Sequence, residues 1–131
     1  SDLDLVATAA RTGKPVVLQV GTASELELAE VVATAHANGS GGIALVQSVI
    51  DVDLEGLDAL RRHGSVVGIA DRSPGPAIPL AAISRGASIV EKRFSLRTGS
   101  KGLVPTEVSA VVRDCEQAWA SLGSDRHWTI N

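Results

Sequence analysis

The residues of this chain that could do chemistry stand in two short charged clusters, each directly after an apolar run. The candidates, in chain order, are Asp71, Arg72, Lys92, Arg93, Arg97 and Lys101. If both apolar runs are parallel strands, the clusters meet at the C-terminal edge of a sheet, where parallel α/β folds place their ligands. Cationic groups gathered there favour a phosphate or a carboxylate. We therefore expect a site for a phosphorylated or carboxylated small molecule; the alternative is a solvated basic rim paired with Asp71 and Glu91.

The other residue types with reactive side chains suggest no site. The single cysteine, Cys115, lies at helical spacing among apolar residues, which predicts a buried and inert thiol. His36 and His63 fall near expected helix C-termini, where a cation suits the helix dipole. His127 belongs to a polar tail and is expected to be exposed or packed. Because no cysteine or histidine cluster has metal-ligand spacing, we assign no catalytic residue and no metal.

Short apolar, β-branched runs alternate along the chain with longer segments of helical period. We expect strands over 14–20, 43–47, 65–70 and 88–92, and helices over 2–11, 24–38, 53–63, 76–84 and 105–122. The order is α(βα)4, an α/β fold. Because the strand runs are apolar throughout rather than alternating, the sequence predicts a four-stranded parallel sheet that is buried on both faces.

Length and composition limit the architecture and the setting. A chain of 131 residues is too short for a complete eight-unit barrel, which needs roughly 250, so an open sheet or half of a barrel remains. A net charge of −3 gives no overall reason to bind nucleic acid or an anionic membrane. No apolar run approaches the roughly 18 residues that span a bilayer. One cysteine suits a reducing, cytoplasmic setting, which we take as the expectation.

Five segments resemble one known family. They are 12–24, 43–48, 68–73 (Gly-Ile-Ala-Asp-Arg-Ser), 86–95 (Gly-Ala-Ser-Ile-Val-Glu-Lys-Arg-Phe-Ser) and 105–108. Their order and spacing resemble those of the sialic acid synthase family, whose enzymes condense phosphoenolpyruvate with an N-acylated amino sugar, using a divalent metal. The resemblance implies units five to eight of a TIM barrel, a half-barrel domain over 1–123 with a tail over 124–131, and a role in carbohydrate biosynthesis.

The same resemblance implies a loss of catalysis. The two metal-binding histidines of the family fall on Arg72 and Arg93, and a guanidinium stays protonated and only donates hydrogen bonds. The family's substrate loops are also replaced, by 48–53 and by 99–102. We therefore expect a partial, catalytically incomplete synthase domain, a pseudoenzyme, without a cofactor. The alternative is a non-catalytic module that binds an anion or phosphosugar or interacts with another protein.

A half-barrel exposes unpaired backbone groups at both edge strands and leaves its inward face uncovered. We expect either a homo-oligomer, in which two copies pair, or a complementary half-barrel that supplies the missing strands. A third possibility is a flattened four-stranded sheet in which the first helix covers an edge.

Overall fold

The computed structural model describes residues 2–49, 54–64, 66–97 and 102–123, and within them helices and strands alternate as the sequence predicts. The helices are α1 (Leu3–Ala10), α2 (Glu25–Ala37), α3 (Glu55–Arg61), α4 (Ala77–Ser84) and α5 (Pro105–Ser121). The strands are β1 (Val16–Val20), β2 (Ile43–Val49), β3 (Val66–Asp71) and β4 (Ile89–Lys92). Each end of a helix or strand lies within about two residues of the end predicted from the sequence. The expected helix start at Asp53 and the tail over 124–131 lie outside the described residues.

Local side-chain hydrogen bonds explain where the first two helices begin. Ser24 caps α2 reciprocally: its hydroxyl accepts a hydrogen bond from the backbone N–H of Glu27, and the Glu27 carboxylate accepts one from the backbone N–H of Ser24. Asp2 caps α1 by accepting from the backbone N–H of Leu5. Such caps satisfy backbone donors that have no partner inside the helix.

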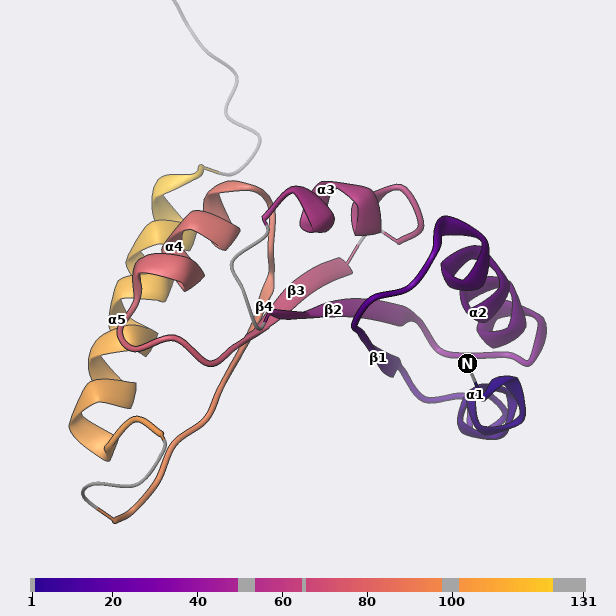
Figure 1. Ribbon diagram of the computed structural model, residues 1–131, viewed down its shortest axis with the longest axis horizontal. Helices are drawn as coiled ribbons and strands as arrows, with labels where there is room; N and C mark the ends of the chain where they lie inside the picture. The colour runs from indigo at the N-terminus through magenta and orange to yellow at the C-terminus, as the bar shows by residue number, and fades with distance from the viewer. Residues whose placement is uncertain (1, 50–53, 65, 98–101, 124–131) are drawn as a thin grey trace, which may run out of the picture.

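The four strands form one parallel sheet in the order β1-β2-β3-β4. Figure 1 shows the strands along the inside of an arc, with α2, α3 and α4 on its outer side and α1 and α5 towards its two ends. Consecutive parallel strands joined by outer helices, in sequential order and curving one way, are half of a (β/α)8 barrel. The structure thus confirms the half-barrel and excludes the flattened alternative.

The hydrophobic core lies between the sheet and the outer helices. Leu18, Leu45 and Val67 stand side by side in the strand register and face the helices, where Leu57 of α3 is fully buried against them. Because side chains alternate along a strand, every second residue belongs to this helix-facing side.

The other side of the sheet differs from its expectation. Burial on both faces was predicted, and Ala44 and Val46 of β2 are indeed buried on the inner side of the arc. On the same side, however, Val17 of β1 is 55% exposed and Val66 of β3 is 39% exposed. The physical reason is that the inner face of a barrel is covered by the strands opposite, which the described residues do not contain. No described helix is long and apolar enough to cross a bilayer.

Candidate functional site

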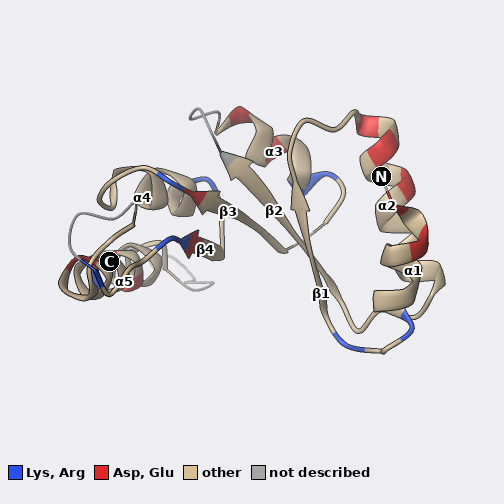
Figure 2. Ribbon diagram, turned by 60° about the horizontal axis from the view of Figure 1, so that its bottom comes forward, with Lys and Arg blue, Asp and Glu red and all other residues tan. Residues whose placement is uncertain are grey.

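Two arginines meet at the C-terminal edge of the sheet. Arg72 directly follows β3, and Arg93 directly follows β4, the neighbouring strand. Both line one cavity of about 530 Å³, which we call the arginine cavity. Its complete lining is Arg72, Ser73, Pro74, Arg93, Gly102, Leu103 and Glu107. Figure 2 shows basic positions at the ends of β3 and β4, whereas acidic positions follow one another along α2.

Glu107 supplies the negative charge of the arginine cavity. It lies in the first turn of α5, where its carboxylate accepts a hydrogen bond of 2.8 Å from the backbone N–H of Val104. A carboxylate there offsets the positive end of the helix dipole. Any preference of the cavity for anions therefore rests on Arg72 and Arg93, whose two guanidinium groups outnumber this single carboxylate.

Asp71 and Lys92 form a buried ion pair on the helix-facing side of the sheet. The Lys92 ammonium lies 2.7 Å from the Asp71 carboxylate, and the side chains are only 9% and 2% exposed. Lys92 also donates to the backbone carbonyls of Ser73 at 2.6 Å and Gly75 at 3.0 Å. The Asp71 carboxylate accepts from the backbone N–H and the hydroxyl of Ser73. The pair therefore fixes the loop between β3 and α4, on which Arg72 stands.

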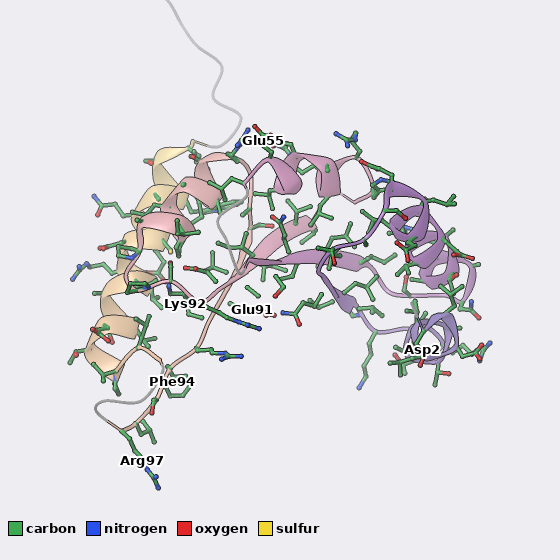
Figure 3. The ribbon with its side chains drawn as sticks, in the orientation of Figure 1. Asp2, Glu55, Glu91, Lys92, Phe94 and Arg97 are labelled. Carbon is green, nitrogen blue, oxygen red and sulfur yellow. The ribbon has the colours of Figure 1, made fainter. Side chains whose placement is uncertain are left out.

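The structure divides the six sequence-predicted site residues between several places. Arg72 and Arg93 lie together, whereas Asp71 and Lys92 belong to the opposite side of the sheet and satisfy each other. Figure 3 shows Glu91 and Lys92 pointing to opposite sides of β4, and Arg97 far along the extended arm that follows it. Arg97 lines no part of the arginine cavity. Lys101 lies outside the described residues.

The donor set of the arginine cavity does not fit a divalent metal. Guanidinium groups have no lone pair to offer, and the cavity holds one carboxylate and one hydroxyl, those of Glu107 and Ser73. Within the described ranges, no group of three or more histidine, cysteine, aspartate or glutamate side chains is arranged to hold an ion. What these residues can do chemically is bind and orient an anionic group.

Sequence reasoning missed one charged cluster and one member of the cavity. Glu25, at the start of α2, pairs with both Arg62 and His63 at the end of α3. The hydrogen bond from His63, followed by that from Arg62, lowers the pKa of Glu25 below its ordinary value of 4.5. No local signal joins residues so far apart in sequence. Glu107, by contrast, was within a recognised motif, but only the fold places it beside the arginines.

Comparisons with known proteins place these observations in a family context. The model of the NeuB family matches residues 1–127. An uncharacterised protein of Methanocaldococcus jannaschii is 30% identical over 92% of this chain and 40% of its own length. The pseudaminic acid synthase of Helicobacter pylori is 33% identical over 72% of this chain and 30% of its own length.

A solved structure agrees with the fold. The spore coat polysaccharide biosynthesis protein SpsE of Bacillus subtilis superimposes with a TM-score of 0.79 at 26% identity, over 92% of this chain and 38% of that protein. The chain thus spans about two fifths of the length of the relatives that it matches over nearly all of its residues.

Proposed function

Because the chain belongs to the NeuB family, we propose that it serves carbohydrate biosynthesis as half of a sialic acid synthase-like barrel whose arginine cavity binds a phosphate or carboxylate. The observation that carries the proposal is the convergence of Arg72 and Arg93 on one cavity at the C-terminal edge of neighbouring parallel strands. That edge is where barrels of this architecture place ligands.

The chemistry of the family suggests the class of ligand. Phosphoenolpyruvate carries both a phosphate and a carboxylate, and a guanidinium can bind either group through two parallel hydrogen bonds. The two arginines can thus hold such an anion through their fixed positive charge. A guanidinium group cannot, however, act as a Lewis acid that binds and exchanges ligands as a metal ion does. We therefore propose a binding role and expect no condensation from this chain alone.

Hydrogen bonds hold the backbone around each of the two arginines. Arg72 stands between Asp71 and Ser73, which the buried ion pair with Lys92 fixes. Arg93 directly follows β4. Its backbone carbonyl accepts a hydrogen bond from the backbone N–H of Leu103, which lies just before α5. Both backbones are thus anchored while both side chains remain exposed, as a binding site for a diffusible anion requires.

Isothermal titration with phosphoenolpyruvate and with inorganic phosphate tests the proposal. We expect Arg72→Ala and Arg93→Ala each to weaken binding about tenfold, as the loss of one charge-assisted hydrogen-bonding group does. Arg113→Ala is the matched control, because Arg113 lies on the outside of α5 and lines no part of the cavity. Equal losses in all three variants, or none, would overturn the proposal.

Elemental analysis of the purified protein separates the binding module from a catalytic fragment. We expect no stoichiometric manganese or magnesium, because the two family ligand positions are arginines. Stoichiometric metal that survives dialysis would contradict the assignment of the cavity to anion binding.

A further inference from the structure

The arginine cavity holds charges of both signs that do not neutralise each other. Within the part of the chain that the structure describes, the side chains of Arg72 and Arg93 form no hydrogen bond or ion pair, and Glu107 forms no ion pair. Two cations and one carboxylate therefore line the same space of about 530 Å³ without being paired. A cavity of that volume has the size of a small-molecule site, so one bound molecule can contact charges of both signs.

The start of α5 fixes the position of the Glu107 carboxylate. One of its oxygens, Oε2, accepts the hydrogen bond from the backbone N–H of Val104. Pro105, at the first position of the helix, has a backbone angle that already suits the helical conformation. The carboxylate is therefore held at its own wall of the cavity, and its second oxygen, Oε1, accepts no hydrogen bond from any described residue.

Ser73 adds a second acceptor to the arginine cavity. Its hydroxyl donates to the Asp71 carboxylate at 2.9 Å, so it presents lone pairs rather than a proton to the cavity. The cavity thus has donors on two guanidinium groups and acceptors on Glu107 and Ser73. A fully ionised phosphate or carboxylate offers acceptors only, and it would use the guanidinium donors alone.

Backbone contacts keep the acceptor wall in place beside Arg93. The backbone N–H of Leu103 donates to the Arg93 carbonyl at 2.9 Å, and the Leu103 carbonyl accepts from the Ser95 N–H at 2.8 Å. Gly102 lies so close to Phe94 that an added Cβ would approach the Phe94 carbonyl carbon to 3.1 Å. The segment that leads into α5 is thus pinned against the segment that follows β4.

We propose that the arginine cavity binds a zwitterion, a small molecule that carries a phosphate or carboxylate at one end and an ammonium group at the other. The anionic group binds Arg72 and Arg93, and the ammonium group, which only donates hydrogen bonds, binds Glu107 and the Ser73 hydroxyl. The inference rests on the proposed function and deepens it, because both require the anionic group to bind the arginines. A bare anion is repelled by Glu107, whereas an ammonium group makes this carboxylate a partner.

Calorimetric titration with O-phosphoethanolamine and with ethyl phosphate tests the proposal, because these ligands differ only in the ammonium group. A cavity that acted through its arginines alone would prefer ethyl phosphate, whose net negative charge is larger. We expect O-phosphoethanolamine to bind roughly threefold more tightly instead, as a partly exposed ion pair contributes. β-Alanine and propionate repeat the comparison for a carboxylate, so the pair that binds more tightly identifies the anionic group.

Glu107→Gln separates the negative charge from the helix cap, since glutamine keeps an acceptor for the Val104 N–H. In this variant the order should reverse, with ethyl phosphate bound more tightly than O-phosphoethanolamine. Glu116→Gln is the matched control, because Glu116 is exposed on the same helix and lines no part of the arginine cavity. It changes the net charge equally and should keep the order of the parent. Circular dichroism checks that both variants keep the fold.

The proposal is overturned if in neither pair the ammonium-bearing ligand binds more tightly to the parent, or if Glu107→Gln leaves its preference intact. Anion binding is read separately, from Arg72→Ala. If that variant binds ethyl phosphate more weakly but the parent does not prefer the ammonium group, the proposed function stands and zwitterion recognition fails. If Arg72→Ala changes the affinity for no ligand, or if none of the four ligands binds, both fail.

Discussion

Replacing Lys92 by methionine tests the role of the buried ion pair. The substitution leaves the Asp71 carboxylate, 2% exposed, with only the two donors of Ser73, and it removes the donor of the Ser73 and Gly75 carbonyls. Breaking a buried pair by removing one partner typically costs about 3–5 kcal/mol, because an uncompensated charge remains in a poorly solvated place. We expect a loss of that size in the free energy of unfolding.

The chain offers a control of almost equal geometry but different burial. Arg85 and Asp58 approach to 2.8 Å, against 2.7 Å for Lys92 and Asp71, but their side chains are 41% and 47% exposed. An exposed pair contributes about 0–1 kcal/mol, since water replaces the lost partner. Arg85→Met should therefore lower the free energy of unfolding by no more than that.

Urea unfolding at pH 7, followed by far-ultraviolet circular dichroism, measures both losses. The double variant Asp71→Asn with Lys92→Met should recover part of the loss, because no buried charge is left alone. If Lys92→Met is already unfolded before urea is added, a double variant that still folds would show that the lone buried charge of Asp71 caused the loss. A Lys92→Met loss equal to that of Arg85→Met would refute the reasoning.

Three further predictions concern single groups. Glu107→Gln should bind phosphate a few-fold more tightly than the parent, as measured by calorimetry. The amide oxygen still accepts from the Val104 N–H, while the negative charge that repels phosphate is gone from the cavity. Unchanged affinity would place the ligand elsewhere. The lowered pKa of Glu25 stabilises the fold above its ordinary value of 4.5, and this contribution is lost as the pH falls through the folded-state pKa. Glu25→Gln should therefore be less stable than the parent at pH 7, with the difference shrinking in urea titrations below pH 4.5; a constant difference would contradict this origin. Burial raises the pKa of the Cys115 thiol above 9.0, so iodoacetamide at pH 8 should alkylate it more slowly in the folded chain than in urea, and equal rates would show a freely solvated thiol.

Much of the fold follows from local chemistry. The apolar run over 43–47, the glycines before it, and the pairing of Ser24 with Glu27 each specify an element without help from the rest of the chain. Local signals of this kind are read from a few neighbouring residues, and they set the bounds of most helices and strands.

The site was less predictable, because it depends on which alternate residues of each strand face the helices. Val66, Gly68 and Ala70 are as apolar as Val67 and Ile69, so the sequence of β3 does not reveal which side the helices cover. Register places Asp71 beside Lys92 on the helix side, where each satisfies the other. Of the predicted site residues that the structure describes, only Arg72 and Arg93, one residue further along each chain segment, line the arginine cavity.

The extra helix at each end of the sheet also bears on solubility. Exposed edge strands invite copies of a protein to add edge to edge into long assemblies, and barrels escape this hazard by closing. Here β1 of one molecule could extend β4 of the next without end, but α1 and α5 both cover that junction from the same side. Crowding between α1 of one molecule and α5 of the next would therefore oppose such open-ended addition.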